Sequence, residues 1–179
     1  MSVHLAFAER DLRALDRLAG EALLCPLFED DRPPRGVAGL LDFRMGARLS
    51  RLCMSGFLTG RAGELVLMPG RPKIPFDKIV IAGLGPAEAF DEPSFERSLA
   101  AALRTLAGLQ VRRAAIELPG RQSGAIDAQR ALTALTSLLG ARGEQPATLD
   151  AEALTVIDEP ATQRVFGEVV RAFRARARR

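Results

Sequence analysis

Two loops of this 179-residue sequence carry the residue types best suited to bind a small ligand. Each follows an apolar, strand-like segment: residues 29–39 combine adjacent carboxylates with glycines, and residues 83–85 read Gly-Leu-Gly. Backbone N–H groups at the start of a helix can bind an anion, and adjacent carboxylates can hold a hard cation. The candidate ligand-binding residues are therefore Asp30, Asp31, Gly36, Val37, Gly39, Gly83 and Gly85.

A structural role is the simpler interpretation of both loops. The run at Gly83 lacks the third glycine of a dinucleotide-binding fingerprint, and Pro86 removes a backbone donor that an anion would need. Adjacent carboxylates such as those near Asp30 are also typical of a solvated loop. Neither interpretation is excluded by the sequence, and no metal ligand is assigned.

The sequence contains no recognisable catalytic motif. His4 is the only histidine, so a histidine-rich zinc site is excluded. The Gly-x-Ser-x-Gly nucleophile elbow and the glycine-rich phosphate loop ending in Lys-Ser/Thr are both missing. Cys25 and Cys53 lie in apolar segments and are expected to be buried, reduced thiols. We expect neither a catalytic residue nor a cofactor.

Arginines are concentrated at the C-terminal end, within a chain whose formal net charge is +3. The candidates for contact with nucleic acid or an acidic partner protein are Arg174, Arg176, Arg178 and Arg179. Arginines without interleaved aromatic residues predict weak, salt-dependent binding to nucleic acid with no sequence preference. We favour a solubilising chain end instead, because this net charge is small for a dedicated nucleic-acid binder.

The segments that must position these residues alternate between strand and helix patterns. The clearest unit is a buried strand at 78–82, a helix at 93–107 and a second buried strand at 114–118. Such alternation predicts an α/β fold, in which helices cover both faces of one sheet. We predict a three-layer α/β/α sandwich with a mixed, mostly parallel sheet of about six strands.

Three further predictions concern the elements outside that unit. One long helix is expected at 37–53, from a continuous apolar stripe. Residues 64–68 are expected to pair with 78–82 as a loose hairpin, which makes the sheet mixed. Pro26 has no N–H group, so its strand is expected at a sheet edge or at a bulge.

Length and composition indicate one domain. We assign it to residues 1–175, followed by a basic tail at 176–179. The first residues do not resemble a secretion signal, and no apolar run approaches the roughly 20 residues that span a bilayer. The sequence therefore predicts a cytoplasmic protein with no membrane partner.

The order of segments between residues 22 and 85 carries a resemblance to a known family. A strand leads into Pro-Leu-Phe-Glu-Asp-Asp at 26–31, and Gly-Val-Ala-Gly-Leu-Leu-Asp at 36–42 then opens a helix. Gly-Phe-Leu-Thr-Gly at 56–60 and Phe-Asp-Lys-Ile-Val-Ile-Ala-Gly-Leu-Gly at 76–85 follow. In this order the sequence resembles the N-terminal domain of the leucine aminopeptidase (cytosol aminopeptidase) family.

The resemblance implies a fold similar to the macro domain. Residues 36–41 then lie where macro domains carry a glycine-rich loop for ADP-ribose. Macro domains usually place an asparagine just before that loop, whereas this sequence contains no asparagine, tyrosine or tryptophan. The resemblance therefore predicts weak or absent ADP-ribose binding.

The resemblance also implies a chain without peptidase chemistry. In the aminopeptidases the metal ions and catalytic residues lie in a C-terminal domain, and its Asn-Thr-Asp-Ala-Glu-Gly-Arg signature is absent here. No catalytic or metal-binding residue can be carried over, so we expect a protein that is not an enzyme.

Two classes of function remain open. The first is a non-catalytic interaction or oligomerisation module that binds a protein partner or itself. The alternative is a binding protein for an anionic ligand, either a nucleotide such as ADP-ribose or a nucleic acid. An exposed apolar patch would favour the first class, and a basic groove with converging backbone amides would favour the second.

Overall fold

The computed structural model describes residues 3–140 and 151–177 and contains one mixed six-stranded sheet. The strands lie in the order β1-β6-β5-β2-β4-β3, and only β3 runs antiparallel to its neighbour. They are β1 (His4–Glu9), β2 (Gly20–Leu27), β3 (Leu65–Pro69), β4 (Phe76–Gly83), β5 (Arg113–Ile116) and β6 (Ala153–Asp158).

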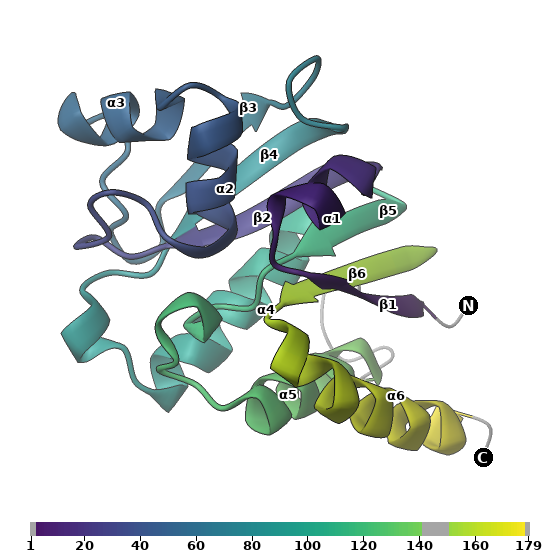
Figure 1. Cartoon of the computed structure of the whole chain (residues 1–179). Coiled ribbons are helices and arrows are strands. Elements are labelled where there is room, and N and C mark those ends of the chain that lie inside the picture. Colours follow the sequence, from purple (N-terminus) through teal and green to yellow (C-terminus); the bar gives the residue numbers. More distant parts are fainter. Residues whose placement is uncertain (1–2, 141–150, 178–179) are drawn as a thin grey trace.

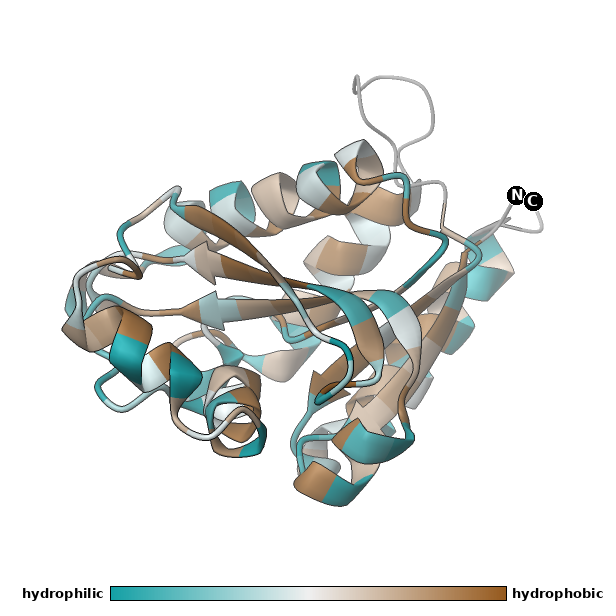
Figure 2. Ribbon diagram, turned by 90° about the horizontal axis from the view of Figure 1, so that it is seen from above, coloured by the Kyte–Doolittle hydropathy of each residue, from teal (hydrophilic) through white to brown (hydrophobic). Residues whose placement is uncertain are grey.

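Helices cover both faces of this sheet, as Figures 1 and 2 show. One face packs against α1 (Leu12–Arg17), α2 (Gly36–Arg44) and α3 (Arg48–Met54). The other packs against α4 (Glu92–Gly108), α5 (Ala128–Gly140) and α6 (Gln163–Ala177). Two separate hydrophobic clusters fill the two interfaces. The predicted three-layer sandwich with a mixed sheet of six strands is confirmed.

The central strand–helix–strand unit forms as its sequence predicts. Asp91 accepts a hydrogen bond from the Ser94 backbone N–H at 2.9 Å, which satisfies one free donor at the start of α4. Phe95, Leu99 and Leu106 then recur on one face and are buried against the sheet. β4 has a paired strand on each side, so the predicted interior position of 78–82 is confirmed.

The predicted single helix at 37–53 is wrong. The chain forms α2 and α3 instead, and Gly46 and Ala47 between them have positive φ values of 64° and 60°. The Asp42 carboxylate accepts the Ser50 backbone N–H at 2.9 Å and so supports the start of α3. Both helices bury their apolar residues in the same cluster, which is why the apolar stripe continued across the break.

The expected edge or bulge at Pro26 is also wrong, because β2 lies between β5 and β4 in the middle of the sheet. The ladder between β2 and β5 ends at Leu24 and Ile116, and its last bond runs from the Glu117 N–H to the Leu24 carbonyl. Alternate residues of β2 face β5, so the missing N–H of Pro26 points to a place beyond the end of that ladder. The fold therefore accommodates the proline without losing a hydrogen bond.

The other sequence expectations on the fold are met. β3 and β4 form the predicted antiparallel hairpin. Cys25 and Cys53 are free and buried. Among the described residues, no helix is both long and apolar enough to cross a membrane.

We predict that Gly83→Ala destabilises the fold at the end of β4. A Cβ atom there would lie 2.1 Å from the Arg61 carbonyl oxygen, so backbone would have to move. We expect a loss of about 1–3 kcal/mol in unfolding free energy, measured by urea denaturation. The control is Gly108→Ala, where a Cβ meets nothing within 4 Å and helix propensity should add up to about 1 kcal/mol. Equal stability of the two variants would contradict the prediction.

Candidate functional site

The two candidate loops lie side by side at the carboxyl ends of β2 and β4. The Leu84 N–H donates to the Leu27 carbonyl at 3.0 Å, and the Glu29 N–H donates to the Gly85 carbonyl at 2.9 Å. The Asp30 carboxylate accepts the Ala87 N–H at 2.8 Å. The fold therefore brings together the loops that the sequence selected as a ligand site, and their contacts are largely with each other.

The carboxylate of Asp31 is buried within its own loop. It accepts the Phe28 N–H at 3.4 Å and lies 3.5 Å from the Arg35 guanidinium. Burial raises the pKa of Asp31, against the opposing effects of the Phe28 N–H and the Arg35 charge. Its contacts shape the turn that leads into α2.

The start of α2 is already bound by a carboxylate of this chain. The Val37 N–H donates to Glu117 Oε2 at 2.8 Å, at the position that an anionic ligand would take at a helix start. Gly36 has a φ of +61°, and a Cβ there would lie 2.6 Å from both Glu117 oxygens. Glycine is therefore required at 36 for the approach of this carboxylate. Gly39 lies one turn further on, and its N–H donates to the Arg35 carbonyl.

Glu117 is fully buried at the end of β5 and pairs with one charged side chain among the described residues. Arg10 Nη1 lies 2.9 Å from Glu117 Oε1, and the same guanidinium pairs with the more exposed Glu159. Burial raises the pKa of Glu117 to about 7, although the Val37 N–H and Arg10 both oppose the shift. The site thus holds a carboxylate that titrates near neutral pH.

A second buried ion pair lies beside the first. Arg121 Nε is 2.8 Å from Asp158 Oδ2, and Arg121 also donates to the Ile126 carbonyl at 2.6 Å. The side-chain amide of nearby Gln122 is buried and has no hydrogen-bond partner within the described part of the chain. These charged residues fix the loops after β1, β5 and β6 relative to one another.

The sequence analysis missed Arg10, Glu117, Arg121 and Asp158 as a group. A signal was present, because Glu117 follows the apolar segment 114–116 and Asp158 follows 153–157. A charged residue at the end of a buried strand is rarely left without a partner. The arginine partners could not be identified without the fold, because Arg10 is 107 positions from Glu117.

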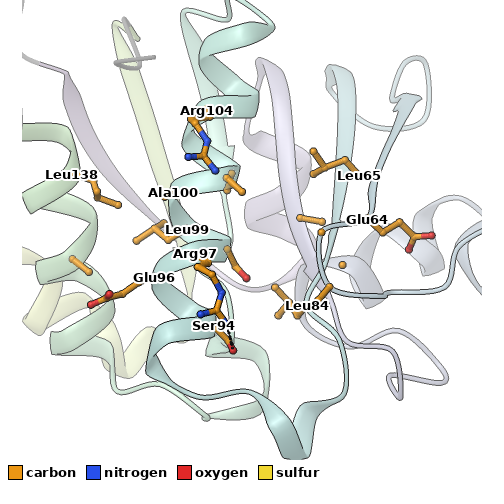
Figure 3. A pocket seen from close by; sticks show the side chains of 18 of the residues that line it. Glu64, Leu65, Leu84, Ser94, Glu96, Arg97, Leu99, Ala100, Arg104 and Leu138 are labelled. Atoms are coloured by element: carbon orange, nitrogen blue, oxygen red, sulfur yellow. Dashed lines mark hydrogen bonds between the residues drawn. The ribbon is translucent and has the colours of Figure 1, made fainter. Parts of the chain in front are cut away.

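A groove of about 830 Å³ lies on the other side of the molecule's sheet, along α4 (Figure 3). Strand β3 and the end of β4 bound it on one side, and α5 contributes to its lining. The apolar lining residues include Leu65, Ala82, Leu84, Leu99, Ala102 and Leu138. Polar side chains along it include Glu64, Glu96, Arg97 and Arg104.

β3 is the edge strand of the sheet beside this groove. Leu65 and Leu67 are 49% and 57% exposed, which is unusual for two leucines of one short strand. Met68, between them and the strand end, is buried against the α2–α3 side. The alternation therefore leaves an apolar row on the groove side of β3 with no helix above it.

The C-terminal arginines are only partly covered by the structure. Arg174 and Arg176 are exposed near the end of α6, whereas Arg178 and Arg179 lie outside the described residues. Within residues 3–140 and 151–177, no group of three or more His, Cys, Asp or Glu side chains could hold a metal ion.

Comparison with known proteins identifies a family and shows what share of its relatives' length this chain spans. A family model described as the N-terminal domain of the cytosol aminopeptidase family matches residues 25–142, more than half of the chain. A probable cytosol aminopeptidase of Corynebacterium diphtheriae is 33% identical over 91 residues, which are 50% of this chain and 18% of that protein. One of Solibacter usitatus is 30% identical over 112 residues, which are 63% of this chain and 21% of that protein. The chain spans about a fifth of the length of these relatives.

Solved structures show the same fold. A tomato leucine aminopeptidase has a TM-score of 0.60 at 18% identity and covers 96% of this chain with 36% of its own. A macrodomain of Oceanobacillus iheyensis has a TM-score of 0.69 at 12% identity, with coverages of 96% and 93%. A Trypanosoma brucei macrodomain in complex with ADP-ribose has a TM-score of 0.68 at 16% identity, with coverages of 93% and 69%. At such identities the likeness concerns the fold, and the predicted macro-domain-like fold is confirmed.

We predict that Glu117 makes stability depend on pH between about 4.5 and 7. Its pKa is raised from 4.5 to about 7 in the folded protein, so its stabilising contribution is full below pH 4.5 and is lost as pH rises through 7. Glu117→Gln should remove this dependence, which amounts to at most roughly 3 kcal/mol. Urea denaturation of both proteins across this pH range measures it.

The matched control for this experiment is Glu159→Gln, which removes the more exposed partner of Arg10. It should leave the pH slope between 4.5 and 7 nearly unchanged, since the buried carboxylate remains. A native slope retained in Glu117→Gln would show that another group is responsible.

Proposed function

The chain belongs to the cytosol aminopeptidase family through its N-terminal domain, and from this premise we propose that it is a non-catalytic interaction module. Its docking surface is the groove between β3 and α4, which binds a partner protein or a second copy of the chain. The expected cytoplasmic location is part of the same proposal, supported by relatives described as cytosol aminopeptidases.

One observation carries this proposal: an edge strand exposes two leucines beside an apolar groove. Contiguous exposed apolar surface is uncommon on monomeric proteins and typically marks a binding site. Covering the exposed halves of Leu65 and Leu67 would contribute about 1 kcal/mol each. An edge strand also offers free backbone groups, which a partner can use for hydrogen bonds.

The anionic-ligand alternative has less support. It rests on the loops at the carboxyl ends of β2 and β4 and on the likeness to a macrodomain in complex with ADP-ribose. An anion at Val37 would have to displace the Glu117 carboxylate, which already uses that N–H. The absence of asparagine, tyrosine and tryptophan from the sequence removes the usual orienting contacts. Of the four candidate arginines for nucleic-acid binding, Arg174 and Arg176 lie within the described residues.

We predict that the 179-residue chain does not hydrolyse leucine amide. The family match covers the N-terminal domain, and metal-assisted hydrolysis needs a cation held by several ligands beside the substrate. Purified protein with added zinc or manganese should release no more product than buffer containing the same ion. Hydrolysis that is abolished by a chelator would contradict the prediction.

We predict that Leu67→Ser weakens partner binding about fivefold or more, because it removes roughly 1 kcal/mol of buried apolar contact. The control is Met54→Ser, which alters a more exposed apolar side chain on α3 (87%, against 57% for Leu67), away from the groove. Tagged proteins are used to capture partners from native cell lysate, and bound amounts are compared by quantitative mass spectrometry. A partner retained by native protein and Met54→Ser but depleted by Leu67→Ser supports the proposal. Identical partner sets for all three proteins would refute it.

A further inference from the structure

We propose that the occupant of the β3–α4 groove is an extended segment of a partner protein, rich in acidic and apolar residues, which pairs with β3 as a seventh strand. This inference rests on the proposed function and specifies the partner's chemistry. Three properties of the groove support it: the free backbone edge of β3, the small side chains of α4 and the arginines along the rim.

The backbone of β3 is arranged to receive a strand. Gly83 N–H donates to the Glu64 carbonyl at 2.8 Å, and Gly70 N–H donates to the Asp77 carbonyl at 3.2 Å. Even-numbered residues of this segment therefore bond to β4, and alternation in an antiparallel ladder turns Leu65 and Leu67 outward. The N–H and C=O groups of Leu65 and Leu67 can pair with an added strand, and the Leu65 side chain lines the groove.

The sequence of α4 leaves space beside Leu65. Ser94, Ser98 and Ala101 recur at helical spacing and belong to the groove lining. Because the side chains at these positions are small, they leave space between α4 and β3. An inserted apolar side chain can therefore contact Leu65 and Leu84. The groove is thus a consequence of side-chain size along one helix face.

Two arginines lie along the rim of the groove. Arg97 and Arg104 lie two turns apart on the exposed ridge of α4, about 10.5 Å along the axis (Figure 3). Arg97 donates to the neutral Ser94 hydroxyl at 3.0 Å, and its charge helps to lower the pKa of Asp91. Neither Arg97 nor Arg104 forms an ion pair within 4.0 Å with a described residue. Carboxylates on the partner would supply the missing counter-charges.

The acidic side chains of the groove are directed elsewhere. Glu64 accepts the Thr59 N–H at 3.0 Å and the Gly60 N–H at 2.6 Å, so its charge is used within its own loop. Glu96 points away from Leu65, toward the α5 side of α4 (Figure 3). An acidic partner therefore meets the arginines without strong repulsion from these carboxylates.

Charge also favours this occupant over a second copy of the chain. Pairing of β3 with β3 of another copy would bring two sets of Arg97 and Arg104 to one junction, in a chain with a net charge of +3. Like charges at a junction oppose association.

The spacing of the two arginines predicts the spacing of acidic residues in the partner. On an added strand, groove-facing residues four positions apart are about 13 Å apart, which flexible arginines two turns apart can span. The expected pattern is acidic–x–apolar–x–acidic.

The probe is a labelled synthetic peptide of about nine residues. It carries two aspartates four positions apart with leucine midway, valine at both ends and threonine elsewhere. Matched peptides replace both aspartates by lysine, or replace leucine by proline. Fluorescence anisotropy with native protein should show binding of the aspartate peptide, weaker at high salt, and no binding of the lysine or proline peptides.

The double variant Arg97→Gln/Arg104→Gln should weaken binding of the aspartate peptide about tenfold and remove its salt dependence. Hydrogen exchange should show protection of the Leu65 and Leu67 N–H groups by the peptide. The control Arg48→Gln/Arg51→Gln changes two exposed arginines of α3 and should bind like native protein.

Several results would overturn the inference while leaving the proposed function in place. Equal binding of the lysine and aspartate peptides would exclude an acidic partner. Binding without protection of Leu65 and Leu67 would exclude strand pairing, and a native dimer lost in Leu67→Ser would identify a second copy as the occupant. No binding of any peptide also overturns it, whereas the proposed function fails only if Leu67→Ser leaves partner capture unchanged.

Discussion

The cost of burying one carboxylate determines how the loops at the carboxyl ends of the strands are arranged. Glu117 is fully buried, and an ionised carboxylate without partners in such a place would cost several kcal/mol. Arg10 and the Val37 N–H supply the partners, and this requirement places the end of β1 and the start of α2 against the end of β5. It also requires glycine at 36. The loops that surround this edge are therefore arranged around an internal ion pair, which leaves little of the edge available to an external anion.

Much of the fold could be predicted because its signals are local. The segment 78–82 is apolar on both sides, Asp91 caps a helix, and the turn before β4 contains Pro72. The failures come from interactions that are distant or that mimic a local pattern. Pro26 is tolerated in a central strand because β5 ends early, which only the register reveals. The break in the segment 37–53 preserves the apolar stripe, so periodicity could not detect it.

The candidate site was predictable only in part, for related reasons. Glycines and carboxylates at strand ends could be located, and the fold does bring Asp30 and Gly85 into neighbouring loops. The partner that binds the Val37 N–H could not be identified, because Glu117 reaches it across 80 positions of sequence. The groove could not be predicted because it results from small side chains on α4. Ser98 and Ala101 give no signal in the sequence and matter only because they lie opposite a strand that no helix covers. The carboxyl ends of the strands are therefore occupied by ion pairs within the chain, whereas the edge strand β3 is open beside the groove.

An exposed edge strand carries a risk of its own, since one copy can template the next. In this chain the risk is limited by where the strand ends. Pro69 closes β3, and its position in the alternating ladder turns its missing N–H outward, next to the free groups of Leu65 and Leu67. Pairing along this edge therefore ends at Pro69, which limits it to a short segment. Pro69 thus limits how many residues of another chain can pair with β3.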